Sequence, residues 1–144
     1  MLKYIHRTAT ACIQGGKDYP DISGNANFYQ RDGVVWVVIS VSGLPENESG
    51  FFALHIHEGK SCSGNGFPQT GSHYNPVNSP HPMHAGDLPP LLSCDGEAYM
   101  AVITNRFSID DIMGRSVVIH NKADDFKSQP AGDAGEKIAC GIIE

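Results

Sequence analysis

The sequence has no apolar run that approaches the roughly 20 residues with which a helix crosses a bilayer. It has no basic run either, and a formal net charge of −6 argues against nucleic acid as a partner. Residues 1–7 are too polar for the apolar region of a signal peptide. We therefore expect no membrane span and no nucleic-acid partner. The location is cytoplasmic if Met1 is the native start and extracytoplasmic if a signal peptide has been removed.

Cysteine is scarce, and its spacing argues against one kind of metal site. The four cysteines form no C-x-x-C pair, so a four-thiolate zinc site is not expected. One or two disulfides could form, and the sequence alone does not assign them. Cys12 alternates with threonine and isoleucine in a strand-like run, so we expect a small buried side chain there. The cysteines are Cys12, Cys62, Cys94 and Cys140.

The sequence also shows no convincing amphipathic helix, and its pattern predicts short β-strands separated by turns. Asp32-Gly33 and Asp95-Gly96 each lie between two such runs, which is the strongest short-range signal for a hairpin. No repeat or linker divides the chain, so we expect residues 1–144 to form a single domain. Eight short strands with regular turns favour an antiparallel β-sandwich or flattened barrel. The strands are expected at residues 8–13, 24–30, 34–42, 51–57, 91–93, 97–104, 116–120 and 137–143.

Two long segments interrupt the strand pattern. Residues 58–92 are rich in glycine, proline, serine and asparagine and contain three histidines. Residues 121–136 are polar and carry Pro130, Gly132 and Gly135. Long loops in a compact domain are usually functional, so we expect most of the chemistry in these two segments.

Six of the seven histidines form a pattern that favours metal binding. His55 and His57 stand at positions i and i+2 near the end of an apolar strand, so both imidazoles face the same side and can converge on one ion. Residues 73–87 supply enough ligands for a tetrahedral zinc site with three nitrogens and one oxygen. Each of these side chains alone could be solvated or hydrogen-bonded, but the combination favours metal. The other candidate metal ligands are His73, His81, His84, Asp87 and His120. His6 fits no such pattern and is expected to be structural.

At these residues the sequence resembles the copper/zinc superoxide dismutase family, as a bacterial-type member with short loops. The resemblance runs from about residue 8 to residue 143. It implies an all-β, eight-stranded antiparallel Greek-key β-sandwich or flattened barrel, with copper and zinc as cofactors and superoxide as substrate. Relatives are commonly dimers, so a homodimer is one assembly that the resemblance allows. The most specific stretches are residues 54–58, 71–76, 85–88, 118–120 with 123–125, and 132–135 leading to 139–141.

The resemblance also implies a role for each site residue. His55, His57 and His120 would bind copper alone, and His73 would bridge copper and zinc. Asp124 would not bind metal but would accept hydrogen bonds from the non-ligating nitrogens of His55 and His81, as ligating imidazoles require. The zinc site would be completed by His81, His84 and Asp87, and the family disulfide would join Cys62 to Cys140.

The implied chemistry follows from the ligand types. Four imidazoles suit copper, which cycles between two oxidation states, whereas zinc has no redox chemistry. One superoxide would be oxidised to oxygen and a second reduced, with protons, to hydrogen peroxide. His73 would exchange a proton during the cycle. It and Lys137 are the residues to which the resemblance gives a catalytic role.

Lys137 is the main departure from the family, which usually has arginine three residues before the second disulfide cysteine. Lysine keeps the positive charge but offers a point charge on a flexible stem in place of a planar fork. We expect activity to survive but to fall below that of Lys137→Arg. A solvated surface lysine beside Glu136 is the alternative. Both loop segments are shorter than in many family members. The short spacing between His81 and His84 makes their assignment as zinc ligands less direct. The compact segment 121–136 leads us to expect weaker electrostatic guidance of the substrate.

Three other functions compete with this interpretation. A non-catalytic copper- and zinc-binding protein of the same fold would explain the ligands without turnover. An extracellular β-sandwich interaction module would leave six patterned ligands unexplained. A hydrolytic zinc enzyme fits poorly, because four protein ligands would leave the zinc no open position.

Overall fold

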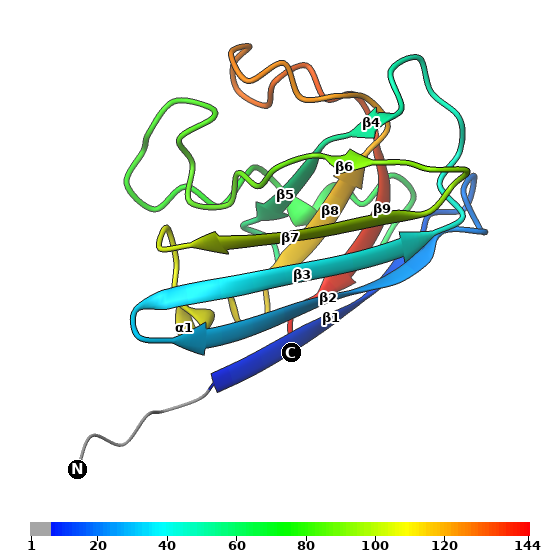
Figure 1. The fold of residues 1–144 in the computed structure, drawn as a ribbon. Coiled ribbons are helices and arrows are strands. Elements are labelled where there is room, and N and C mark those ends of the chain that lie inside the picture. The colour runs from blue at the N-terminus through cyan, green and yellow to red at the C-terminus, as the bar shows by residue number, and fades with distance from the viewer. Residues whose placement is uncertain (1–6) are drawn as a thin grey trace.

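The computed structural model describes residues 7–144, so the expectation for His6 lies outside the described residues (Figure 1). Seven antiparallel strands form one sheet in the order β5-β8-β9-β1-β2-β3-β7, and β4 pairs with β6 in a second, small sheet. The strands are β1 (Arg7–Gly15), β2 (Ser23–Arg31), β3 (Val34–Ser42), β4 (Phe51–Phe52), β5 (Leu54–His57), β6 (Leu91–Leu92), β7 (Ala98–Thr104), β8 (Ser116–His120) and β9 (Lys137–Ile142).

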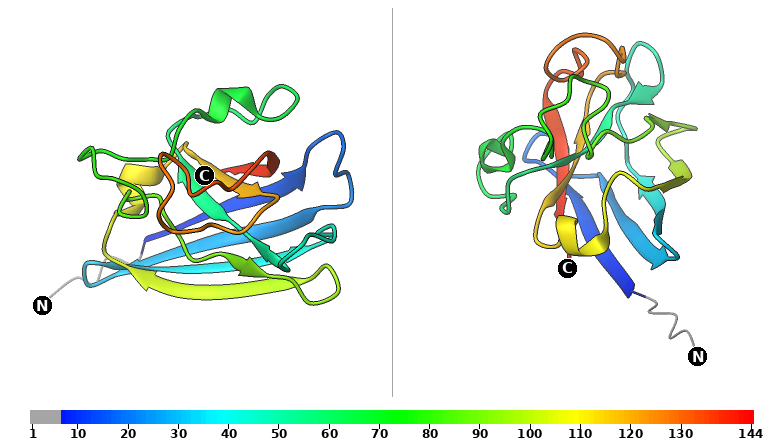
Figure 2. Two further views of the ribbon diagram at one scale, coloured as in Figure 1. Left: turned by 90° about the horizontal axis from the view of Figure 1, so that it is seen from above. Right: turned by 90° about the vertical axis from the view of Figure 1, so that its left-hand side faces the viewer.

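The large sheet is curled into a half-barrel. In Figures 1 and 2, β1, β2, β3 and β7 form one wall, and β5, β8 and β9 form the wall behind it. Alternate residues of the long strands point into the space between the walls, where they are buried, while their neighbours are exposed. The all-β antiparallel architecture that the sequence predicts is therefore confirmed. The largest buried side chains include Phe28, Ile39, Phe52, Leu54 and Ile119.

The Asp32-Gly33 hairpin forms as the sequence predicts. Arg31 at the end of β2 pairs with Val34 at the start of β3, which leaves a two-residue turn. Both turn residues have positive φ, +52° for Asp32 and +80° for Gly33, as the hairpin turns that match strand twist require.

The single strand expected over residues 51–57 is divided at Ala53. Before this residue β4 pairs with β6, and after it β5 pairs with β8. Ala53 itself bonds to another segment, because its N–H donates to Lys122 and its carbonyl accepts from the N–H of His120. The chain thus changes sheets at Ala53, which periodicity along one strand cannot reveal.

Helical structure in the described residues is limited to two short turns. The 3₁₀ turn η1 covers Pro68–Thr70, and α1 covers Ile109–Ile112. Ser108 and Asp111 cap α1 reciprocally, with the Ser108 hydroxyl accepting from the N–H of Asp111 and the Asp111 carboxylate accepting from the N–H of Ser108. No helix among residues 7–144 is long and apolar enough to cross a membrane.

The cysteines divide into one disulfide and two free thiols. Cys62 is bonded to Cys140, which ties the segment 58–92 to β9, as the family resemblance implies. Cys12 and Cys94 are free and exposed. The expectation that Cys12 is buried is wrong, because Ala11 and Ile13 point into the core and Cys12, between them, points out.

We predict that the disulfide contributes about 4 kcal/mol to the free energy of unfolding, because it closes a loop with a sequence separation of 78 residues. Urea unfolding of metal-free protein should show a loss of this order in the Cys62→Ser/Cys140→Ser variant. Cys12→Ser/Cys94→Ser is the matched control, since both residues are exposed and unbonded. A disulfide variant as stable as this control would contradict the prediction.

Candidate metal centre

Strand β5 supplies two of the histidines that the sequence singles out. All four of its residues are buried, and its register sets His55 opposite Val118 and His57 opposite Ser116 of β8. His120 ends β8, where the pairing with β9 shifts between Ile119 and His120. A bulge of this kind redirects a side chain at the end of a strand. The rings of His55 and His120 lie 5.1 Å apart between centroids.

The segment 58–92 folds back against β5 and carries the other histidines to it. His73 forms an isolated bridge with His57, and Asp87 forms one with His55. The carbonyl of Gly86 accepts from the N–H of Ile56. A Cβ at Gly86 would lie 2.2 Å from the carbonyl oxygen of Ile56, so only glycine permits this close approach.

The nitrogens of His57 and His120 that face each other are both left as acceptors. Nδ1 of His57 donates to the Gly71 carbonyl at 2.9 Å, and Nδ1 of His120 donates to the Gly135 carbonyl at 3.1 Å. These carbonyls accept only, so in the neutral rings each hydrogen is on Nδ1. The two Nε2 atoms lie 3.2 Å apart with no hydrogen between them. A cation between them would satisfy both.

Burial keeps these two imidazoles neutral. It lowers the pKa of His57 to about 2 and the pKa of His120 to about 3. Neutral imidazole is the form that binds a metal, so the protein presents both rings ready to ligate at neutral pH.

Asp124 fixes two further histidines at once. Its Oδ2 accepts from Nε2 of His55 at 2.8 Å, and its Oδ1 accepts from Nε2 of His81 at 2.7 Å. Burial alone would raise the pKa of Asp124, but these two hydrogen bonds and one from the Phe126 N–H hold the pKa well below its usual range. Gly132 packs against the carboxylate, where a Cβ would lie 2.0 Å from Oδ1.

Three ring nitrogens of the cluster are buried without a hydrogen-bond partner: Nδ1 of His55, Nδ1 of His81 and Nε2 of His73. Burying an unpaired polar atom costs free energy, so a group of such nitrogens in one place indicates a site at which they can bind a metal ion. Four imidazoles with donor atoms within 4.8 Å of one another form the first set: His55, His57, His73 and His120.

The second set surrounds Asp87. Its Oδ1 lies 2.8 Å from Nδ1 of His73, and its Oδ2 lies 3.1 Å from Nδ1 of His81 and 3.3 Å from Nδ1 of His84. The Nδ1 atoms of His73 and His84 are 3.1 Å apart. Ligands about 2.0 Å from a tetrahedral zinc ion are separated by about 3.3 Å, so these donors fit zinc. Burial disfavours the Asp87 carboxylate, but the hydrogen bond from His73 and the three nearby imidazoles lower its pKa.

His73 belongs to both sets, with Nε2 available to the first and Nδ1 facing the second. The structure thus brings together all seven residues that the sequence singles out as ligands, with Asp124 behind them. The sequence reasoning missed the Gly71 and Gly135 carbonyls, which determine the tautomers of His57 and His120. No side-chain signal marks a backbone acceptor, and only the pairing of distant loops brings it to the ring.

Lys137 lies at the mouth of this cluster. Its Nζ donates to the Thr70 hydroxyl at 2.7 Å and to the Gly71 carbonyl at 3.0 Å. Burial lowers its pKa. With His57, His73 and His120 it lines a cavity of about 510 Å³. The interpretation of Lys137 as a solvated surface side chain is therefore not supported.

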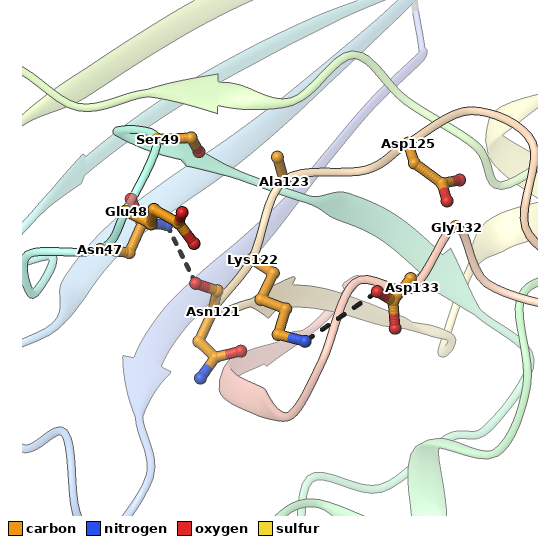
Figure 3. Close-up of a pocket in the computed structure, with 9 residues that line it drawn as sticks. All are labelled: Asn47, Glu48, Ser49, Asn121, Lys122, Ala123, Asp125, Gly132 and Asp133. Carbon is orange, nitrogen blue, oxygen red and sulfur yellow. Dashed lines mark hydrogen bonds and ion pairs between the residues drawn. The ribbon is translucent and has the colours of Figure 1, made fainter.

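A neighbouring cavity of about 550 Å³ is not part of the centre (Figure 3). It lies between residues 47–49 and the segment 121–133, and no histidine lines it. Lys122 and Asp133 approach to 4.0 Å there, and both are exposed. The Asn47 side chain donates to the Asn121 carbonyl at 2.9 Å, which anchors the start of the segment that carries Asp124.

The fold and these donor sets define a β-barrel protein whose buried histidine groups fit metal ions. Comparison with known proteins agrees, since the family model for copper/zinc superoxide dismutase matches residues 22–143. The chain belongs to this family.

Similar proteins cover most of the chain. "Superoxide dismutase [Cu-Zn] 2" of Aquifex aeolicus is 33% identical over 138 residues, covering 85% of this chain and 80% of that protein. "Superoxide dismutase [Cu-Zn]" of Deinococcus radiodurans is 34% identical over 144 residues, covering 85% and 78%. The Legionella pneumophila protein of the same name is 31% identical over 143 residues, covering 94% and 86%.

Asp124→Asn should weaken metal binding about 10- to 100-fold, because asparagine offers one acceptor oxygen and turns an N–H₂ group toward the second histidine. Competition against a chelator at fixed pH measures the loss for zinc and copper separately. Asp133→Asn is the matched control, since Asp133 is exposed and its positive φ of 51° suits asparagine. Equal affinity in the two variants would show that Asp124 does not orient the ligands.

Proposed function

We propose that this protein dismutates superoxide with copper held by His55, His57, His73 and His120 and zinc held by His73, His81, His84 and Asp87. The observation that carries the proposal is a buried cluster of imidazoles in which four donors converge at Nε2 of His73 and three further donors, from His81, His84 and Asp87, gather at its Nδ1. The first set consists only of imidazoles, which suits copper, and the second fits tetrahedral zinc.

Copper, when bound, supplies the redox chemistry, in which one superoxide is oxidised to oxygen and another is reduced to hydrogen peroxide. The chain supplies position and protons. Carbonyls hold His57 and His120, and Asp124 holds His55, so three rings keep a fixed orientation. His73 presents Nε2 to one set and Nδ1 to the other, so its Nε2 is a buried position at which a proton can be held beside the cavity.

Lys137 supplies the positive charge that attracts the substrate into the cavity. The formal net charge of the chain is −6, so a local cation is needed to favour an anion at this point. The adjacent Glu136 forms no ion pair with Lys137 among the described residues, and its carboxylate accepts hydrogen bonds from the Tyr19 hydroxyl and from the Asn121 side chain. Lys137 instead donates to Thr70 and Gly71, so the two side chains have different partners.

The non-catalytic alternative is a protein of the same fold that binds copper and zinc without turnover. The cavity lined by His57, His73, His120 and Lys137 supports turnover instead, because it gives a small anion a route to the first donor set. The hydrolytic alternative lacks an open zinc position, since four protein donors surround that site.

The dismutation rate per bound copper tests the proposal. Protein reconstituted with copper and zinc should approach roughly 10⁸–10⁹ M⁻¹s⁻¹, a limit for which superoxide dismutase is itself a known example. Lys137→Arg should be faster than wild type, because its planar fork orients an anion better than a point charge. Pulse radiolysis at low ionic strength measures both rates. Superoxide decay no faster than in buffer, with copper bound, would favour the binding protein.

We also propose a homodimer formed through the outer face of the half-barrel. Tyr29, Trp36 and Ile103 are register neighbours across β2, β3 and β7, and these residues are 46%, 51% and 54% exposed. Such an aligned apolar row favours a protein partner over water. Sedimentation velocity should show a dimer for wild type and a monomer for Trp36→Glu, whereas Val77→Glu, at another exposed apolar residue, should stay dimeric. A monomeric wild type would refute this assembly.

A further inference from the structure

The ammonium group of Lys137 has two protein acceptors, and one of them is a buried side chain. We propose that Thr70 is a positioning residue, which holds Lys137 at a fixed point in the cavity and so supplies the rigidity that a lysine stem lacks. The inference rests on the proposed function, because it assigns Lys137 the task of attracting superoxide.

The hydroxyl of Thr70 is oriented for this task. Its oxygen lies 2.8 Å from the carbonyl of Phe67 and 2.7 Å from Nζ of Lys137. A hydroxyl has one hydrogen, and an ammonium group can only donate. The hydrogen of Thr70 is therefore directed to Phe67, and the lone pairs of the oxygen face Lys137.

Thr70 itself is held rigidly. It is fully buried at the end of η1, its N–H donates to the Phe67 carbonyl, and its own carbonyl accepts from the N–H of Gly59. Phe67 packs against Val118 and the disulfide residues. The acceptor thus belongs to a part of the loop that β8 and the disulfide immobilise.

The second acceptor links Lys137 to the metal centre. The Gly71 carbonyl accepts from Nζ of Lys137 at 3.0 Å and from Nδ1 of His57 at 2.9 Å. Two adjacent acceptors, Thr70 and Gly71, locate the ammonium group, and one of them also locates the His57 ring. The positive charge therefore has a defined position relative to a copper ligand.

The ammonium group of Lys137 keeps one hydrogen for the substrate. An ammonium group has three hydrogens, and Thr70 and Gly71 accept two of them. The third has no acceptor among residues 7–144 and is available to an anion in the cavity. Without the Thr70 hydroxyl only the Gly71 carbonyl would hold the ammonium group, and the flexible stem would let the charge occupy a wider range of positions.

The test compares Thr70→Val, which keeps the shape and removes the hydroxyl, with Thr70→Ser, which keeps the hydroxyl. At full copper and zinc content, Thr70→Val should lower kcat/KM for superoxide about three- to tenfold, since a charge-assisted hydrogen bond is lost. Thr70→Ser should stay near wild type. In a Lys137→Met background, Thr70→Val should cause no further loss, because no ammonium group is left to position.

A second readout does not depend on activity. In zinc-loaded protein, which is diamagnetic, an ordered lysine ammonium group should give a resolved ¹H–¹⁵N signal. We expect the Lys137 signal in wild type and Thr70→Ser, and its loss in Thr70→Val; Lys137→Met assigns it. Failure of the proposed function would appear as a wild type without dismutation, whereas failure of the positioning role would appear in this spectrum.

Three kinetic results and one spectroscopic result would overturn the inference. Thr70→Val could match wild type in rate at equal metal content, or it could slow the Lys137→Met protein as much as it slows wild type. Thr70→Ser could also be as slow as Thr70→Val, which would assign the effect to packing. A wild-type spectrum with no ordered Lys137 signal would overturn it as well. Thermal unfolding of each variant verifies that all of them fold.

Discussion

The carboxylate of Asp124 is the contact on which the two donor sets depend most. It accepts from the outer nitrogens of His55 on β5 and His81 in the segment 58–92, and it lies in the segment 121–136 itself. Three parts of the chain that are distant in sequence are therefore held by one side chain. Because each imidazole has only two nitrogens, the one that Asp124 takes determines the one that remains for a metal. The hydrogen bonds from both rings keep the carboxylate ionised in spite of its burial.

The protein concentrates unsatisfied polar atoms at a point where most folds avoid them. Nδ1 of His55, Nδ1 of His81 and Nε2 of His73 are buried without hydrogen-bond partners, and Nε2 of His57 faces Nε2 of His120. Burying such atoms is unfavourable for the polypeptide alone, so metal binding should contribute strongly to its stability. The surrounding barrel makes this arrangement tolerable, because the strands on both sides of the cluster are packed against a continuous apolar core. We therefore expect the free energy of unfolding to depend on metal binding.

The departure at Lys137 is accommodated by its surroundings. A lysine charge is mobile by nature, but here Thr70 and Gly71 accept two of its three hydrogens, and Glu136 is turned toward Tyr19 and Asn121. The residue that differs from the usual arginine is thus placed by a loop that the disulfide ties to β9. The same loop carries the Gly71 carbonyl that orients His57, so the charge and the ligand share one support.

The sequence by itself determined which residues we propose as ligands and the local geometry that two-residue periodicity controls. His55 and His57 share a face, Asp32-Gly33 makes a hairpin, and the strands lie close to where alternation predicts them, because these features depend on near neighbours in the chain. Only the tertiary structure decided which groups meet across long separations. It divided residues 51–57 at Ala53, turned Cys12 outward, and brought the Gly71 and Gly135 carbonyls and the Thr70 hydroxyl to their partners. These contacts depend on strand pairing and loop packing between distant segments, and neither residue type nor spacing along the chain specifies them.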